Sequence, residues 1–160
     1  MVAMVSRQGR QDQRYNHNGH RLIVGCIPYR IKMDKQSEQV EVLVITSQKG
    51  HGMMFPKGGW ELGETMKEGA CREVMEEAGV QGDVEYLLGK WGYKSKRHDI
   101  FHEAFMFSLK VTEELVQWPE MVSRNRKWAT IDEARQGCQH AWMKEALETL
   151  VLLLSIMKKC

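Results

Sequence analysis

Apolar runs separated by polar turns cover most of the chain and predict a mixture of strands and helices. The runs at residues 21–29 (RLIVGCIPY) and 40–45 (VEVLVI) have the length of strands, and the second is apolar apart from one glutamate, as in a strand buried on both faces. Similar runs at 84–91 and 101–111, and a short one at 127–129, predict three further strands. We therefore expect five strands along the chain.

Residues 65–78 form the clearest predicted helix. Thr65 and Glu68 have the spacing of a capping box, and Gly79 is a natural stop at the other end. Gly69 lies inside this helix, where glycine costs about 1 kcal/mol relative to alanine. We expect another group to approach the helix closely at Gly69.

Two C-terminal segments also have a helical pattern, at residues 131–136 and 142–157. Polar stretches predict a charged hairpin loop at 32–39, a loop at 47–59 and a basic turn at 94–99. The last helix carries apolar side chains three or four positions apart, which predicts a face that packs in the core. These side chains are Met143, Leu147, Leu150, Val151 and Leu154.

The chain has 160 residues and no internal repeat or linker, so we predict a single α/β domain of the α+β sandwich type at residues 21–157. Residues 1–20 are polar, and we expect them to form a flexible arm. With 42% apolar residues, 28% charged residues and a net charge of +2, the composition is that of a globular domain and gives no argument for a nucleic-acid partner. The longest apolar run, residues 150–156, is far shorter than the roughly 20 residues that cross a bilayer, so we expect no membrane partner either.

The four cysteines lie far apart and form no CxxC pair, which favours a reducing compartment. We therefore expect the protein in the cytoplasm. The alternative is the mitochondrion, because Arg7, Arg10 and Arg14 stand against a single acid, Asp12, as in a presequence.

Charge is unevenly distributed along the chain. Residues 61–77 contain six glutamates against Lys67 and Arg72, so this segment has a net charge of −4 and the rest of the chain +6. An acidic patch in a basic surround suits a cation site beside an anionic ligand, whereas a solvated helix face is the simpler explanation. The spacing of the acids distinguishes the two.

Residues 58–80 (GGWELGETMKEGACREVMEEAGV) contain a glycine, five residues, a glutamate, seven residues and then R-E-V-x-E-E-x-G-V. On a helix, Glu73, Glu76 and Glu77 share one face, where three like charges repel unless a cation binds them. A merely solvated helix would pair Glu73 with a base four residues on, but Glu77 stands there. A face that can pack on a sheet lies elsewhere on this helix and consists of Ala70, Val74 and Ala78.

This segment resembles the Nudix box at every defined position. The resemblance implies a mixed sheet flanked by helices with a loop–helix–loop catalytic element, and hydrolysis of a diphosphate linked to another group. Mg²⁺ is the implied cofactor, with Mn²⁺ as the alternative. The matching positions are Gly58, Glu64, Arg72, Glu73, Val74, Glu76, Glu77, Gly79 and Val80.

The resemblance also implies a role for each box residue. Glu73 and Glu77 match metal ligands, and Glu76 matches the general base and is counted among the ligands as well. The base is a different glutamate in some members of the family. Arg72 is expected to orient the catalytic groups. Two backbone or outer positions complete the implied metal site, namely the carbonyl of Gly58 or Gly59 and the carboxylate of Glu64.

Segments outside the box resemble the diphosphoinositol polyphosphate and diadenosine polyphosphate phosphohydrolase branch, and in detail its plant members. These segments are GCIPYR, VLVITSQKG, MFPKGGWELGE and RKWATIDEAR…WMKEAL. A polyanionic small molecule is the implied partner, and we expect a monomer. One departure is that Gln48 and Lys49 stand where relatives place an arginine. The candidate substrate-binding residues are Arg21, Lys49, Lys57, Lys96, Arg97, His98, Arg124 and Arg126.

Two other functions remain open on the sequence. One is a pyrophosphatase for other nucleoside diphosphate derivatives, such as ADP-ribose, NADH or capped RNA. The other is a binding module without catalysis, although such modules usually lose box carboxylates. Among the remaining side chains, Trp60 is expected to stack or act as a lid, Trp91, Trp128 and Trp142 to pack in the core, and Glu103 to be either a metal ligand or a paired carboxylate.

Overall fold

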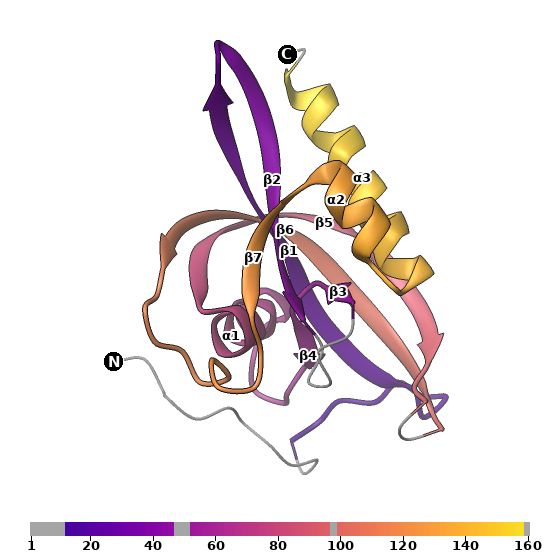
Figure 1. The fold of residues 1–160 in the computed structure, drawn as a ribbon. Coiled ribbons are helices and arrows are strands. Elements are labelled where there is room, and N and C mark those ends of the chain that lie inside the picture. Colours follow the sequence, from indigo (N-terminus) through magenta and orange to yellow (C-terminus); the bar gives the residue numbers. More distant parts are fainter. Residues whose placement is uncertain (1–11, 47–51, 97–98, 159–160) are drawn as a thin grey trace.

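The computed structural model describes residues 12–46, 52–96 and 99–158. Within these residues the chain forms one seven-stranded sheet and three helices (Figure 1). The strands are β1 (Arg21–Asp34), β2 (Ser37–Thr46), β3 (Met53–Met54), β4 (Lys57–Gly59), β5 (Val80–Lys94), β6 (Phe101–Glu114) and β7 (Arg126–Thr130). The helices are α1 (Met66–Ala78), α2 (Ile131–Gly137) and α3 (Ala141–Lys158).

The sheet is mixed, with β1 at its centre. Strands follow the order β3-β2-β1-β6-β5, and β4 and β7 add to β1 and β2 outside this path. β1 is parallel to β6 and antiparallel to β2 and β4. The pairing of Val24 with Gly58 places the strand before α1 on the centre of the sheet.

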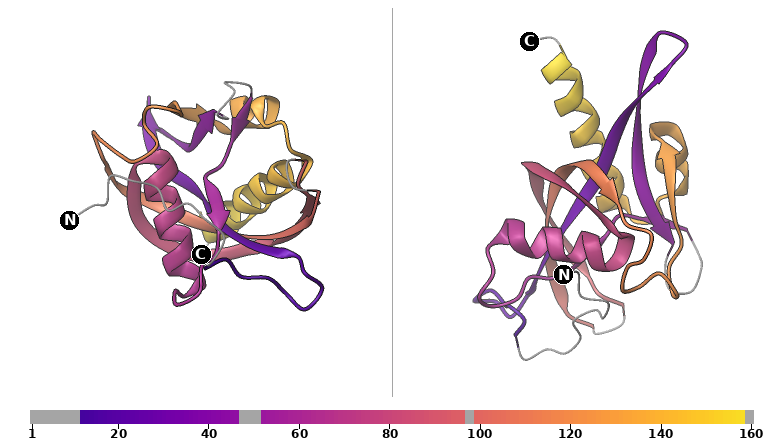
Figure 2. Two further views of the ribbon diagram at one scale, coloured as in Figure 1. Left: turned by 90° about the horizontal axis from the view of Figure 1, so that it is seen from below. Right: turned by 90° about the vertical axis from the view of Figure 1, so that its left-hand side faces the viewer.

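Successive side chains of β1 point to opposite faces, so the strand contributes to two cores. Ile23 and Ile27 lie on the face that packs against α2 and α3. Val24 and Cys26 lie on the face that packs against α1. Figures 1 and 2 show α1 on one side of the sheet and α2 and α3 on the other. The predicted α/β sandwich of a mixed sheet with flanking helices is confirmed.

The helices pack as their patterns predict. Ala70, Val74 and Ala78 of α1 are fully buried against the sheet. Met143, Leu147 and Leu150 of α3 are fully buried on the opposite face, while Val151 and Leu154 are half-buried. No helix within the described residues is long and apolar enough to cross a membrane.

The sequence prediction misses parts of the sheet. The predicted hairpin loop at 32–39 is mostly strand, with a tight turn at Lys35 and Gln36, whose φ angles are 45° and 72°. Both strands project into solvent there, so polar side chains are tolerated on both faces and no apolar alternation marks the strand. The predicted loop at 47–59 contains β3 and β4, which are too short to show a period.

Residues 12–14, which belong to the expected arm, lie along the segment 60–62 that precedes α1. The Leu62 amide donates to the Asp12 carbonyl (2.7 Å), the Arg14 amide to the Trp60 carbonyl (3.2 Å), and the Leu22 amide to the Arg14 carbonyl (2.9 Å). These residues are thus hydrogen-bonded to the domain. The remainder of the expected arm lies outside the described residues.

Candidate active site

α1 is the element that carries the box glutamates. Both halves of its capping box form, since the Thr65 hydroxyl accepts from the Glu68 amide (3.1 Å) and the Glu68 carboxylate accepts from the Thr65 amide (2.8 Å). Gly79 ends the helix with φ 65°, a left-handed conformation that favours glycine. A Cβ at Gly69 would lie 2.8 Å from an oxygen of Glu64, so the close approach expected there is that of a box carboxylate.

Glu73, Glu76 and Glu77 are all buried, with 8%, 3% and 7% of their surfaces exposed. Gly58 lies against the first of them, because a Cβ at this position would overlap the Glu73 carboxylate. The Lys57 amide donates to Glu77 Oε1 at 3.1 Å. Strand β4 therefore lies directly against the acidic face of α1.

Arg72 connects the other box groups through its guanidinium. Its Nε and Nη2 donate to the two oxygens of Glu64 at 3.0 and 2.6 Å. Its Nη1 donates to Glu73 at 2.7 Å and to Glu76 at 3.0 Å, and Nη2 also donates to the Gly59 carbonyl at 2.8 Å. One planar group thus fixes the directions of three carboxylates and one carbonyl.

Burial makes the charge on two of these glutamates costly. Burial, with repulsion from Glu77, raises the pKa of Glu73 to about 8, and burial raises the pKa of Glu77 to about 7 in spite of Arg124 and Lys57. The nearby cations therefore do not fully compensate the acidic cluster. A divalent cation would complete the compensation.

The donor set fits such an ion chemically, because carboxylate and carbonyl oxygens are the ligands that Mg²⁺ and Mn²⁺ accept. Glu73, Glu76 and Glu77, with the carbonyl of Gly58 or Gly59, are the candidate ligands. In the part of the chain that the structure describes, no three acidic, histidine or cysteine side chains are grouped as a metal-binding set. Arg72 instead contacts two of these carboxylates, as described above.

Arg124 is the predicted basic residue that approaches the cluster, from the loop that precedes β7. Its Nη2 lies 3.8 Å from Glu77 Oε2 and its Nε donates to Glu120 at 2.9 Å. Nη1 donates to the Thr46 carbonyl at 3.2 Å, which joins the site to the end of β2. Only 11% of its side chain is exposed, so the guanidinium is held beside the acidic cluster.

Arg126 takes a different position from the one expected of a substrate-binding residue. Its Nη1 donates to the carbonyls of Ala78 and Gly79 at 3.0 Å each, and its Nη2 to the carbonyl of Leu115 at 2.7 Å. Its guanidinium carbon lies 3.9 Å from the centre of the Trp118 ring. Arg126 therefore binds the C-terminal end of α1, and its conformation directs it to main-chain carbonyls rather than to the carboxylates.

The other predicted basic residues that the structure describes fall into two groups by their contacts. Arg21 donates from Nε to Gln13 (2.8 Å), and its Nη2 would lie 2.6 Å from a Cβ at Gly59. Lys57 has its Nζ 5.8 Å from the Tyr93 ring centre. Lys96 is exposed and forms the second group with Lys57, because both charges act on the same histidine. Lys49, Arg97 and His98 lie outside the described residues.

His140, a residue that the sequence analysis did not select, lies near the second group. Burial and the positive charges of Lys57 and Lys96 lower its pKa. Nothing in the sequence indicates this, since the three residues come from distant parts of the chain.

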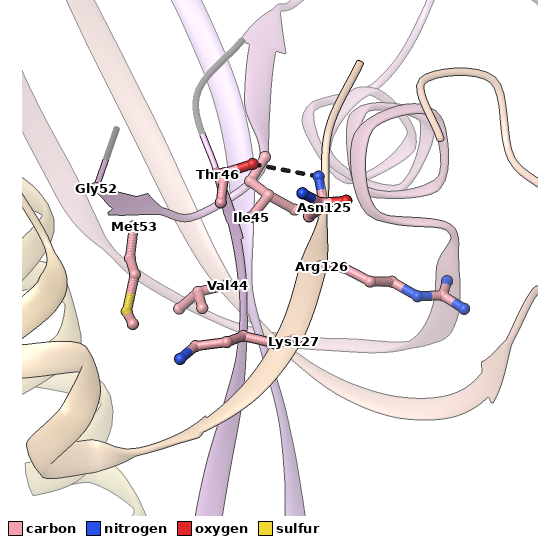
Figure 3. Close-up of a pocket in the computed structure, with 8 residues that line it drawn as sticks. All are labelled: Val44, Ile45, Thr46, Gly52, Met53, Asn125, Arg126 and Lys127. Atoms are coloured by element: carbon pink, nitrogen blue, oxygen red, sulfur yellow. Dashed lines mark hydrogen bonds between the residues drawn. The ribbon is translucent and has the colours of Figure 1, made fainter. Parts of the chain in front are cut away.

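A pocket of about 290 Å³ opens between the ends of β2, β3 and β7, next to Asn125 (Figure 3), and it is connected to Arg124 by one residue. Thr46 links the two, because its carbonyl accepts from Arg124 while its hydroxyl accepts from the Asn125 amide (3.2 Å). Lys127 and Met53 line the pocket, and the side chain of Arg126 points away from it.

One connecting segment, residues 115–126, holds the C-terminal end of α1. The Glu120 amide donates to the Glu76 carbonyl (3.0 Å), the Trp118 indole to the Glu77 carbonyl (3.2 Å), and the Leu115 amide to the Gly79 carbonyl (2.8 Å). With Arg126 on Ala78, four successive carbonyls are taken by this segment. The sequence analysis missed Trp118 and Glu120, because their partners lie about 40 residues away along the chain.

Trp60 stacks with an arginine, and Glu103 is paired with polar side chains. The Trp60 indole donates to the Glu64 carbonyl (2.9 Å), and Arg14 covers its ring at 4.4 Å. Glu103 accepts from Asn16 at 2.7 Å and lies 3.3 Å from Lys90, so it is a paired carboxylate. Of the tryptophans expected in the core, Trp142 is buried, and Trp91 and Trp128 are half-buried.

Known proteins share this fold and this box. The model of the NUDIX domain matches residues 19–150. Nudix hydrolase 18, mitochondrial, of Arabidopsis thaliana is 57% identical over 160 residues, which cover 98% of this chain and 90% of the relative. Diphosphoinositol polyphosphate phosphohydrolase 3-alpha of Mus musculus is 34% identical over 146 residues, which cover 89% and 85%.

A solved Ap4A hydrolase of C. elegans superimposes with a TM-score of 0.62 at 21% identity, covering 84% of this chain and 97% of that one, which supports the fold. The domain match spans most of the chain, and the Arabidopsis relative is more than half identical along nearly all of it. The chain therefore belongs to the Nudix family and is a Nudix hydrolase.

Proposed function

We propose that the protein hydrolyses a diphosphate bond in diphosphoinositol polyphosphates, diadenosine polyphosphates, or both. The observation that carries this proposal is the buried acidic face of α1, with the basic side chains of Arg124 and Lys57 acting on Glu77. The similarity to a mouse diphosphoinositol polyphosphate phosphohydrolase along most of both chains supports the substrate class. Hydrolysis of a phosphoanhydride mainly requires positioning and charge stabilisation, which a site of this kind supplies.

Each box residue receives a role from its contacts. Nudix enzymes use divalent metal ions, and we propose Mg²⁺, with Mn²⁺ as the alternative, held by Glu73, Glu76, Glu77 and the Gly58 or Gly59 carbonyl. The ion would neutralise phosphate oxygens. Arg72 holds Glu73 and Glu76 in fixed directions through Nη1, so we assign it an orienting role.

Glu76 is our candidate for the general base. It is the most buried of the three glutamates, and Arg72 directs one of its oxygens. The main-chain carbonyl of Glu76 accepts a hydrogen bond from the Glu120 amide, so both the side chain and the main chain of Glu76 are fixed. A carboxylate in this position would accept the proton of the attacking water. Glu64, which Arg72 binds with two hydrogen bonds, would support the site from outside.

The phosphate groups of the substrate would lie among the basic side chains that reach the cluster. Arg124 approaches Glu77, the positive charge of Lys57 also acts on Glu77, and Lys57 and Lys96 both lie near His140. Arg21 is close to Gly59. Arg126 is left out of this group, because it binds the end of α1.

The proposal is tested by a substrate panel with Mg²⁺ that compares an inositol pyrophosphate, diadenosine hexaphosphate, ADP-ribose and NADH. We expect turnover of the first two, and abolition of that turnover in Glu76→Gln, with the melting temperature of wild type. Glu145→Gln, the same change at an exposed position of α3, is the matched control. A preference for ADP-ribose or NADH would refute the substrate class, and full activity of Glu76→Gln would refute the assigned base.

We also propose a monomer that acts on a small molecule. We propose that the protein is located in the cytoplasm, with the mitochondrion as the alternative. The name of the Arabidopsis relative, Nudix hydrolase 18, mitochondrial, supports the mitochondrion. Fractionation of cells that express the full chain separates the two.

A further inference from the structure

Arg14 contacts three consecutive parts of the loop between β4 and α1, which we call the catalytic loop (residues 60–65). Its amide donates to the Trp60 carbonyl at 3.2 Å. Its guanidinium donates from Nε to the Glu61 carbonyl (3.0 Å) and from Nη2 to the Glu64 carbonyl (3.2 Å). The same guanidinium lies over the Trp60 ring at 4.4 Å. One side chain therefore holds both ends of the loop.

The middle of the catalytic loop is exposed, so hydrogen bonds at its two ends do much to set its shape. Gly63 has φ 85°, and Leu62 is 58% exposed, so the middle of the loop packs against little. Within the loop, the Trp60 indole donates to the Glu64 carbonyl and the Glu61 amide donates to the Glu64 carboxylate at 2.8 Å. The guanidinium of Arg14 adds to this set by stacking on the indole and sharing its acceptor.

The two ends of this loop are the points at which Arg72 is held. Nη2 of Arg72 donates to the Gly59 carbonyl just before the loop, and Nε and Nη2 donate to the Glu64 carboxylate at its end. Arg72 in turn directs Glu73 and Glu76. A shift of the loop would therefore move Arg72 and, through it, the two box carboxylates.

Arg14 lies in a short segment, residues 12–14, that is hydrogen-bonded to the domain on two sides. The Leu22 amide of β1 donates to the Arg14 carbonyl, and the Leu62 amide donates to the Asp12 carbonyl. Gln13 forms a bridge with Glu61 and accepts from Arg21. The segment is thus tied to the central strand on one side and to the loop on the other.

We propose that Arg14 is a positioning residue of the hydrolase, which fixes the catalytic loop so that Arg72 holds the box carboxylates in their working directions. The inference rests on the roles proposed above for these carboxylates. The positioning role requires the forked, planar shape of the Arg14 guanidinium, because this group contacts two carbonyls and a ring at the same time. A positive charge alone does not suffice.

The test compares Arg14→Ala and Arg14→Lys with Arg30→Ala in the full chain. Arg30 is a matched control, because it covers the Trp128 ring at 4.1 Å and pairs with Glu41 at 2.8 Å away from the box. The first measurement is amide hydrogen exchange of residues 60–65 in the metal-free protein. The second is kcat and KM for whichever panel compound the wild type hydrolyses.

We expect exchange in the catalytic loop to rise about tenfold or more in Arg14→Ala, because the loop opens locally without global unfolding. We expect kcat to fall about 10- to 100-fold, as for a small displacement of catalytic groups, with KM within about threefold of wild type. Arg14→Lys should resemble Arg14→Ala in both measurements, and is the variant to use if the alanine variant does not fold. Arg30→Ala should change neither quantity.

Unchanged exchange in Arg14→Ala would overturn the proposal. A raised KM with unchanged kcat would also overturn it, since Arg14 would then bind substrate. Wild-type behaviour of Arg14→Lys would show that charge, and not geometry, is what matters. Exchange does not depend on turnover, so an inactive wild type would contradict the proposed function while the exchange result still decides the role of Arg14.

Discussion

Replacing Arg126 by alanine should destabilise the protein and leave substrate binding almost unchanged. The guanidinium donates to three main-chain carbonyls, two of them at the C-terminal end of α1, and stacks on Trp118. The helix has no basic residue in its own last turn, so Arg126 also supplies the positive charge that the helix dipole favours there.

The size of the effect follows from these contacts. A hydrogen bond from a charged donor contributes about 1.5–3 kcal/mol net, and a cation over an aromatic ring about 0.5–1 kcal/mol near the surface. Water would replace part of the lost bonding, because Arg126 is only half-buried. We expect a loss of roughly 2–4 kcal/mol in the free energy of unfolding. At about 2–4 °C per kcal/mol for a domain of this size, the melting temperature should fall by roughly 4–16 °C.

The assay is thermal unfolding followed by circular dichroism, together with KM measured well below the transition. Arg135→Ala is the control, since that side chain makes bidentate bonds to Glu148 but is solvated, and should lower the melting temperature much less. Arg124→Ala, two residues from Arg126, should instead change kcat or KM, because Arg124 lies beside Glu77. An unchanged melting temperature with a raised KM in Arg126→Ala would refute the reasoning.

Two further predictions concern the acidic face of α1. The pKa values of Glu73 and Glu77 are raised on folding from 4.5 to about 8 and about 7, so the folded state binds these protons more tightly and loses stability as pH rises through this range. The melting temperature of the metal-free protein should therefore fall between pH 5 and 8, less steeply with Mg²⁺ or in Glu73→Gln; identical slopes in all three samples would contradict this. Gly58→Ala should reduce kcat by about 100-fold, because the added Cβ would overlap the Glu73 carboxylate. Gly92→Ala is the control and should keep full activity, because its Cβ would have no neighbour nearer than 3.9 Å. Equal activities of the two variants would count against the packing at Gly58.

Local features of the catalytic helix could be predicted from the sequence. Thr65, Glu68 and Gly79 act within one or two turns of their own positions, so their spacing alone indicates where α1 begins and ends. The convergence of Glu73 and Glu77 follows from the helical period in the same way.

The remaining parts of the site depend on contacts that no local pattern records. Arg14 meets Glu64 across 50 residues, and Arg126 meets Ala78 across 48. In the sequence Arg124 and Arg126 are alike, since both are basic and precede Trp128. Only the contacts in the folded protein show that Arg124 faces the carboxylates and Arg126 the helix end. Arg124 lies in the loop before β7, whereas Arg126 is the first residue of that strand.

Synthesis on the ribosome proceeds from the N-terminus, so α1 is made well before the segment that completes it. The groups that bind its last carbonyls come from residues 115–126, and Arg126 follows Ala78 by 48 residues. At about 5–20 residues per second, the nascent helix waits roughly 2–10 s for this partner. During that interval the last carbonyls of α1 lack their partners from residues 115–126, and Glu77 lacks Arg124 beside it. The acidic face of α1 therefore gains these contacts only after residue 126 has been synthesised.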